Sequence, residues 1–245
     1  MAFTRRSFLA GLAACPLCAA TARASEGAHW SYEDVQSWGA RDPAARACAV
    51  GAEQSPIDLK GAVKADIRAP TLTWKQQAFE IVNNGYTIQA DAAPGSFAVS
   101  EGRKFELKQF HFHAPSEHAI QGARTAMEAH FVHAGQDGAL LVLGALLSAG
   151  AKNQALATIV GAAPEKEGRE RLKSPIDAST LLPKKRGFFR YEGSLTTPPC
   201  SEVVNWTVFS TPVDVASADI DAFRKLFPMN ARPLQELHRR IVLRN

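Results

Sequence analysis

Seven histidines occur in this 245-residue sequence, and three of them stand where strand geometry could bring them together. The segment 110–113 reads FHFH. If it is a strand, side chains alternate between faces, so His111 and His113 project to the same side about 6.6 Å apart. The segment 128–130 reads EAH, and His130 adds a third ring nitrogen if the two strands pair. Three histidines with a vacant fourth position are typical of catalytic zinc sites, where the open position holds a water.

Two polar residues strengthen this pattern, since an H-x-H pair alone is weak evidence for a metal. Gln109 stands two residues before His111, and Glu128 stands two before His130. Each can accept the second ring proton of a ligand histidine. The other internal histidines, His118 and His133, are expected to be structural. His133 falls on the opposite face from His130 if the strand is regular.

The elements that must position these histidines are mainly strands. Turn-punctuated runs rich in β-branched and aromatic residues predict strands near 71–74, 79–82, 86–90, 96–99, 105–113, 127–133, 139–147, 188–191 and 203–209. The run 139–147 is almost entirely apolar, as in a central strand buried on both faces. Helices are expected near 153–161 and 217–226, the second with Ser217 as its cap. Residues 25–58 are rich in turn formers with little periodicity.

The fold class expected from these runs is mostly β (α+β). No repeat or linker divides the chain after its leader, so residues 25–245 are read as a single domain. Its framework is predicted to be a large, mainly antiparallel twisted central sheet with short peripheral helices.

Residues 1–24 have the features of an export signal of the twin-arginine type. Arg5 and Arg6 precede an apolar stretch, and a small-residue cleavage site ends at Ala24. The apolar stretch is shorter than the roughly 20 residues of a membrane span. The alternative is lipidation at Cys15, within a lipoprotein-like box. Cleavage after Ala24 is the preferred route, and it predicts a periplasmic or secreted protein without stable membrane insertion once the leader is removed.

Cleavage after Ala24 leaves two cysteines, Cys48 and Cys200, in an oxidising compartment where disulfides persist. One bridge between them is the simple expectation, and two unpaired thiols are the alternative.

The charge balance excludes a nucleic-acid binder. Three of the 28 basic residues lie in residues 1–24, so the remaining chain carries 25 basic against 24 acidic residues. A nearly neutral chain has no electrostatic footprint for nucleic acid or an anionic membrane. The expected partner is a small-molecule substrate. A monomer and a homodimer both remain open.

Taken together, the motifs resemble those of α-class carbonic anhydrases of the exported bacterial type, from about residue 29 to the C-terminus. The motifs that carry the resemblance are 54–57 (QSPI), 83–85 (NNG), 109–113 (QFHFH), 115–118 (PSEH), 128–130 (EAH), 193–202 (GSLTTPPCSE) and 230–233 (NARP). The resemblance implies a zinc enzyme that reversibly hydrates carbon dioxide to bicarbonate and a proton by attack of zinc-bound hydroxide. Its ligands would be the three histidines, supported from behind by Gln109, Glu128 and Asn230.

The resemblance also assigns two catalytic residues around that hydroxide. Thr196 is expected to accept a hydrogen bond from it and to donate its own hydroxyl proton to Glu117. This fits their chemistry, because a threonine hydroxyl has one donor and a carboxylate only accepts.

For carbon dioxide itself, the resemblance implies an apolar wall beside the metal, with Thr197 on the polar side. The wall residues would be Val132, Val142, Leu195 and Trp206. It further implies a Cys48–Cys200 disulfide tying the Thr196 loop to the N-terminal segment, and cis bonds at Ser55-Pro56 and Pro198-Pro199.

One residue departs from many fast members of the family, which carry a histidine proton relay directly after the Asn-Gly turn. This sequence has Tyr86 there. A phenol with a pKa near 10 is poorly matched to a zinc water near 7, whereas imidazole near 6.5 is well matched. Slow proton release is therefore expected, with His29 as a substitute relay.

Two other classes compete with this hypothesis. A cupin metalloprotein would use His111, His113 and Glu117 with a later histidine, but Phe105 stands where its pattern needs glycine. An inactive anhydrase-like binding module would have lost zinc ligands, and none is lost here.

Overall fold

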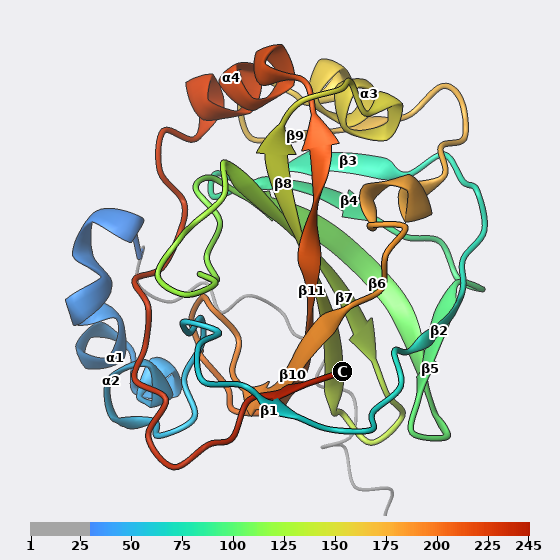
Figure 1. The fold of residues 1–245 in the computed structure, drawn as a ribbon. Helices are drawn as coiled ribbons and strands as arrows, with labels where there is room; N and C mark the ends of the chain where they lie inside the picture. Colours follow the sequence, from blue (N-terminus) through green and yellow to red (C-terminus); the bar gives the residue numbers. More distant parts are fainter. Residues whose placement is uncertain (1–29) are drawn as a thin grey trace, which may run out of the picture.

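The computed structural model describes residues 30–245, and its framework is one large twisted β-sheet (Figure 1). Neighbouring strands follow the order β1-β12-β10-β11-β8-β7-β6-β4-β3-β9, and the β2–β5 ribbon joins at β6. The strands are β1 (Val63–Lys64), β2 (Thr71–Thr73), β3 (Glu80–Asn83), β4 (Ile88–Asp91), β5 (Phe97–Ser100), β6 (Arg103–His113), β7 (Met127–Ala134), β8 (Leu140–Ala149), β9 (Gly168–Arg171), β10 (Phe188–Gly193), β11 (Val204–Val215) and β12 (Leu243–Arg244). The predicted fold class is confirmed. The leader, Cys15 and His29 lie outside the described residues.

Among the described strands, every pairing is antiparallel except β1 with β12 and β11 with β8. Strand β8 lies between β7 and β11, and its residues 141–147 are all buried. This confirms the prediction from its unbroken apolar run, because a strand covered on both faces has no polar side to present. The short strands β1, β9 and β12 were not predicted. Their side chains are mostly exposed, so they lack a hydrophobic pattern.

Strand β6 divides its side chains between two environments. Phe110 and Phe112 are buried in the larger hydrophobic core, and His111 and His113 alternate with them. A second, smaller core gathers on strands β8, β10 and β11 around Trp206. The period-two pattern of the sequence therefore sets which side chains of β6 pack in the main core and which are left to form a site.

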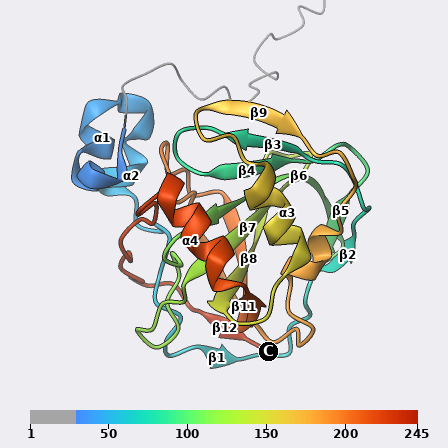
Figure 2. The same cartoon turned by 90° about the horizontal axis from the view of Figure 1, so that it is seen from above.

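The helices are short and lie at the periphery. They are η1 (Tyr32–Ser37), α1 (Trp38–Arg41), η2 (Pro43–Ala45), α2 (Ala47–Val50), α3 (Gln154–Ala162), η3 (Ala178–Leu181) and α4 (Ser217–Leu226). Helices α3 and α4 lie side by side over the sheet (Figure 2) and bury Leu156, Ile159, Ile220 and Phe223 in the main core. The predicted cap Ser217 is wrong by one position. Ala216 is the N-cap residue, and it makes no side-chain capping bond.

The N-terminal segment forms η1 to α2, although its sequence shows little periodicity. Elements of three to six residues are too short to display a helical hydrophobic period, so contacts with the rest of the molecule must fix them. Cys48 of α2 is bonded to Cys200, which confirms the predicted disulfide and rules out two free thiols. The cis bonds expected at Ser55-Pro56 and Pro198-Pro199 are present, and Ala114-Pro115 is also cis.

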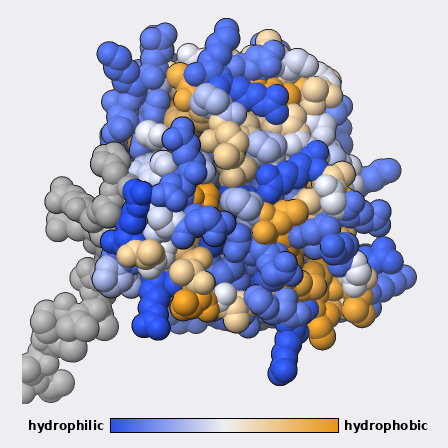
Figure 3. All heavy atoms as spheres, turned by 90° about the vertical axis from the view of Figure 1, so that its left-hand side faces the viewer, coloured by the Kyte–Doolittle hydropathy of each residue, from blue (hydrophilic) through white to orange (hydrophobic). Residues whose placement is uncertain are grey.

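The outer surface mixes polar and apolar side chains. On the face that carries α1 and α2, hydrophilic residues dominate and hydrophobic ones form small groups (Figure 3). Within residues 30–245, no helix has both the length and the apolar character needed to cross a membrane.

Candidate metal centre

Three histidine rings converge between strands β6 and β7. The strand register places His111 directly opposite His130, with His113 two residues further along β6. One ring nitrogen from each of the three lies within 4.8 Å of the others. His113 and His130 are almost completely buried, and His111 is partly exposed. The structure thus brings together the three residues that the sequence singled out.

Each imidazole has a partner behind it that turns one nitrogen toward the centre. His111 Nδ1 lies 2.8 Å from Gln109 Oε1, and His113 Nδ1 lies 2.7 Å from the carbonyl oxygen of Asn230. Because both oxygens only accept, each Nδ1 donates and each Nε2 keeps its lone pair. His130 is turned the other way, with Nε2 3.1 Å from Glu128 Oε1. Its free nitrogen is therefore Nδ1.

Asn230 also anchors the backbone at the end of β6. Its side-chain oxygen accepts a hydrogen bond from the Ala114 amide at 2.8 Å, and its Nδ2 donates to the carbonyls of Phe112 and Tyr86. This one residue therefore fixes both the ring of His113 and the strand end that carries it. Asn230 lies 117 positions after His113, so the partnership has no local signature.

Glu128 is shared between two histidines in a fully buried network. Its Oε1 lies 2.8 Å from His118 Nδ1 as well as 3.1 Å from His130 Nε2, and Oε2 accepts from the His118 amide. His118 Nε2 in turn lies 2.6 Å from the Tyr191 hydroxyl, which donates to Ser55 Oγ. Sequence reasoning gave His118 only a structural role and missed Tyr191. Ser55 lies within the quoted 54–57 motif, which was the available signal.

The electrostatics keep two of the three histidine rings neutral and the supporting carboxylate charged. Burial lowers the pKa of His111 and of His113, so both rings stay neutral near pH 7. Burial works to raise the pKa of Glu128, but the contacts with His118 and His130 outweigh it and hold the pKa well below its usual range. Burial likewise works to lower the pKa of His130, and the adjacent Glu128 carboxylate raises it overall.

Glu117 lies next to the histidines with one oxygen unused. Its Oε1 accepts from the Arg232 amide at 2.7 Å. Its Oε2 is 3.6 Å from His113 Nε2 and 3.8 Å from His130 Nδ1, with no hydrogen-bond partner among the described residues. Thr196 is buried in the loop after β10, and the hydrogen bonds of the described residues do not join it to Glu117. The Thr196–Glu117 contact therefore stays a prediction.

Residues 30–245 correspond to a known family. The family model for eukaryotic-type carbonic anhydrases matches residues 33–245. The chain belongs to this family.

Individual relatives agree with the family model. The carbonic anhydrase of Nostoc sp. is 39% identical over 236 residues, covering 92% of this chain and 89% of that protein. The carbonic anhydrase of Neisseria gonorrhoeae is 39% identical over 237 residues, covering 95% and 94%. The solved α-carbonic anhydrase of Thermovibrio ammonificans, in complex with the inhibitor sulfanilamide, gives a TM-score of 0.86 at 42% identity over 89% of this chain and 99% of that chain. The chain is thus an enzyme of the carbonic anhydrase type, as predicted.

The residues expected to form the apolar wall of this carbonic anhydrase lie in one cluster. Val142 and Trp206 belong to the smaller core, and the half-buried Val132 and Leu195 pack against it. The Trp206 ring is 4.8 Å from the His130 ring, so the cluster adjoins one of the three converging histidines. Thr197, on the adjoining loop, is half-buried, and its carbonyl accepts from the Cys200 amide.

Tyr86 lies just after the Asn-Gly turn, as the sequence predicts, and its ring packs against a neighbouring aromatic ring. It stacks on Trp30 with ring centroids 4.0 Å apart and an interplanar angle of 8°. Gly85, with φ of 82°, makes the turn that presents Tyr86. Burial, followed by the charge of Glu167, raises the pKa of the Tyr86 phenol. Sequence reasoning did not foresee the Trp30 contact.

Proposed function

We propose that this carbonic anhydrase hydrates carbon dioxide reversibly to bicarbonate and a proton at a zinc ion held by His111, His113 and His130. The observation that carries the proposal is the convergence of three ring nitrogens within 4.8 Å. His113 Nε2 is buried with no hydrogen-bond partner among the described residues. A buried lone pair left unpaired costs free energy unless something binds it, so the donor set fits a metal ion.

Zinc suits this set because three neutral imidazoles leave one tetrahedral position open. When bound, zinc lowers the pKa of a coordinated water from 15.7 to about 7 and so supplies a nucleophile at neutral pH. The nearby Glu128 carboxylate offsets part of the metal's charge through His130, and Gln109 and Asn230 fix the orientation of the other two rings.

The remaining steps fall to residues of this chain. Glu117 Oε2, buried and unpartnered, is the acceptor we assign to the hydroxyl proton of Thr196, so that Thr196 accepts from the attacking group and orients it. Val132, Val142, Leu195 and Trp206 form the apolar surface against which carbon dioxide lies, and Thr197 faces it from the polar side. Tyr86 stands in place of the usual histidine relay, and because its phenol is poorly matched to a donor near pKa 7, we propose that proton release limits turnover.

Zinc content and stopped-flow hydration of carbon dioxide, measured on the same samples, test the proposal. We expect the parent protein to retain one zinc per chain after dialysis and to be active, and His130→Ala to lose both properties. His238→Asn is the matched control, because His238 is exposed and asparagine tolerates its φ of 51°. A His130→Ala protein with full zinc content and rate would contradict the ligand assignment.

We also propose that residues 1–24 are a twin-arginine export signal, so that the mature enzyme is periplasmic or secreted. The Cys48–Cys200 disulfide supports this compartment, because disulfides persist in oxidising surroundings. Mass spectrometry of the processed protein should find Ser25 as its first residue. A lipid-modified Cys15 at the N-terminus, or an unprocessed cytoplasmic chain, would contradict it.

A further inference from the structure

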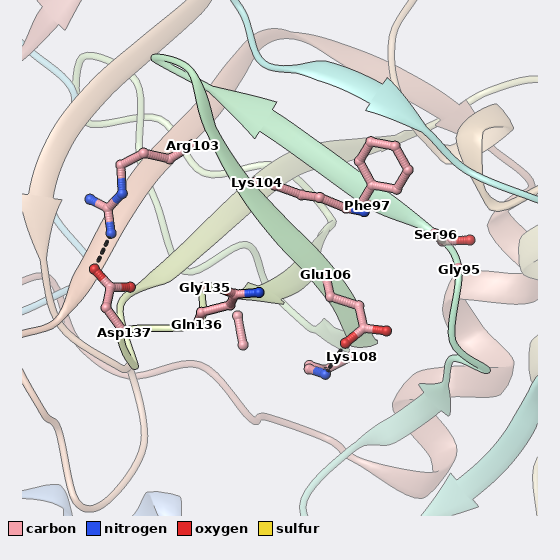
Figure 4. Close-up of a pocket in the computed structure, with 11 residues that line it drawn as sticks. Gly95, Ser96, Phe97, Arg103, Lys104, Glu106, Lys108, Gly135, Gln136 and Asp137 are labelled. Atoms are coloured by element: carbon pink, nitrogen blue, oxygen red, sulfur yellow. Dashed lines mark hydrogen bonds and ion pairs between the residues drawn. The ribbon is translucent and has the colours of Figure 1, made fainter.

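A second concave site lies at the opposite end of strand β6 from the three histidines. It is a cavity of about 670 Å³ between the β5–β6 hairpin and the turn after β7 (Figure 4). Its size falls within the roughly 300–1,000 Å³ of small-molecule sites. In the pairing of β6 with β7, Glu106, which lines the cavity, lies opposite Ala134. His111, five residues further along β6, lies opposite His130. The cavity is thus separate from the metal centre.

Two carboxylates line the cavity, and both are already paired with cations. Glu106 contacts Lys108, and Asp137 contacts Arg103 across the gap between the hairpin and the turn (Figure 4). The hydrogen bond from Lys108 lowers the pKa of Glu106, so this carboxylate remains charged and paired at neutral pH. The charge of Lys104 also favours the ionised form of Glu106, although these two side chains form no ion pair.

Two lysines, one lining the cavity and one beside its edge, form no ion pair among the described residues. Lys104 lines it, with its ammonium 4.0 Å from the centroid of the Phe97 ring. Lys75 lies at the rim of the cavity beside Gly95, which lines it. A β-carbon added to Gly95 would lie 2.9 Å from Lys75 Nζ. The ammonium group of Lys104 thus lines the cavity and that of Lys75 lies beside its Gly95 edge, together with the apolar surface of Phe97 and Ala134.

We propose that this cavity binds a small organic dianion, two carboxylates joined by a short apolar chain. Each carboxylate pairs with one ammonium, of Lys104 and of Lys75, and the connecting methylenes lie against Phe97. A cavity of this volume is much larger than an inorganic anion such as bicarbonate needs. Because both lysines are largely exposed, each ion pair is weak, so the affinity is millimolar and falls as salt is raised.

Backbone amide NMR titration with succinate tests the proposal on the zinc-loaded enzyme saturated with sulfanilamide, which keeps the probe off the metal. We expect saturable shifts confined to residues 95–97, 103–108 and 134–137, with a millimolar Kd. Butyrate, which has one carboxylate, should bind at least fivefold more weakly. Shifts that are absent, unsaturable or spread over all lysine-rich surfaces would overturn the proposal.

Matched variants separate this cavity from general charge attraction. Lys104→Gln and Lys75→Gln should each raise the Kd for succinate at least fivefold, and Lys104→Arg should retain binding. Lys152→Gln is the control, because Lys152 is exposed and outside the cavity. The assignment would be overturned if Lys152→Gln weakened succinate binding as much as Lys104→Gln does. It would also be overturned if Lys104→Gln kept a native spectrum and bound succinate as tightly as the parent.

Discussion

At the scale of single residues, Tyr86 leads us to predict slow proton release. In the proposed mechanism a proton must leave a zinc-bound water with a pKa near 7, and Tyr86 stands where the family resemblance leads us to expect a histidine relay. Burial and Glu167 raise the phenol's pKa still further from 7. A relay group whose pKa differs from that of the proton donor by three or more units transfers protons poorly. The stack on Trp30 also holds the ring in one position.

We therefore predict that Tyr86→His raises kcat several-fold when buffer is dilute, since imidazole near pKa 6.5 is matched to the donor. The parent enzyme should instead accelerate as an imidazole-type buffer is added. Stopped-flow hydration across buffer concentrations measures both effects. Tyr86→Phe is the control and should match the parent. Turnover in Tyr86→His that stays at the parent value in both dilute and saturating buffer would refute the idea.

At the scale of elements, strand β8 shapes the metal centre although it supplies no ligand. Gly144 of β8 lies opposite His130 in the sheet. A β-carbon there would lie 2.7 Å from Glu128 Oε1 and 3.2 Å from Val208. The glycine therefore leaves the space in which Glu128 contacts both His118 and His130.

Gly144→Ala should displace the Glu128 carboxylate and weaken zinc affinity about tenfold or more, the usual effect of disturbing a ligand's supporting partner. Competition with a chromophoric chelator measures this affinity directly. Gly161→Ala in α3 is the matched control, because a β-carbon there meets no neighbouring atom. If both variants bind zinc as the parent does, β8 has no such role.

On the opposite face of β7 from His130, His133 leads to a prediction about the stability of the fold. His133 is buried beside Trp74, and burial lowers its pKa to about 4. The unfolded chain, with a histidine pKa near 6.5, binds a proton that the folded chain does not, so stability falls as pH drops from 6.5 toward 4. From pH 7 to pH 5 the loss from this residue is about 2 kcal/mol.

Urea unfolding at both pH values, for the parent and for His133→Leu, measures this loss. The variant should lose about 2 kcal/mol less than the parent between pH 7 and pH 5. Other histidines titrate in both proteins, so their effects cancel in the comparison. Identical pH dependence in the two proteins would count against a depressed pKa at His133.

At the scale of the whole molecule, the N-terminal helices are tied to the loop that carries Thr196. The disulfide joins Cys48 to Cys200, which are 152 residues apart in the sequence. Cys200 stands four positions after Thr196. The buried Arg232 adds a second tie, because its guanidinium donates to Gln54, Ser55 and Cys48. Its backbone amide meanwhile donates to Glu117, so the same residue contacts the N-terminal segment and the metal centre.

Removing the bridge should destabilise the fold through the unfolded chain. For a loop of this length the chain-entropy model gives about 5 kcal/mol as an upper figure. We expect the double variant Cys48→Ser with Cys200→Ser to lose roughly 2–5 kcal/mol of unfolding free energy in urea. A reductant should bring the parent to the variant's value and leave the variant unchanged. A loss below about 1 kcal/mol would show that the bridge constrains little.

Local periodicity in the sequence was enough to predict the histidine pair and the strands other than the short, exposed β1, β9 and β12. Alternation along 110–113 sends two phenylalanines to the core and two histidines to the site, and this needs only the period of a strand. The apolar run of β8 likewise marks a strand covered on both faces. The Ser217 cap failed because a helix can begin one residue earlier without any side-chain cap.

Only the tertiary structure decided which distant groups complete the metal centre. Asn230, which only the family resemblance placed beside the histidines, reaches His113 across 117 residues, and Tyr191, which was not foreseen, reaches His118 across 73. Such partners are chosen by strand register and by packing, which leave no trace in any short window of sequence. The short N-terminal helices were missed for the same reason. The sequence therefore determined which side chains each strand face carries, and the assembled sheet determined which of these side chains come into contact.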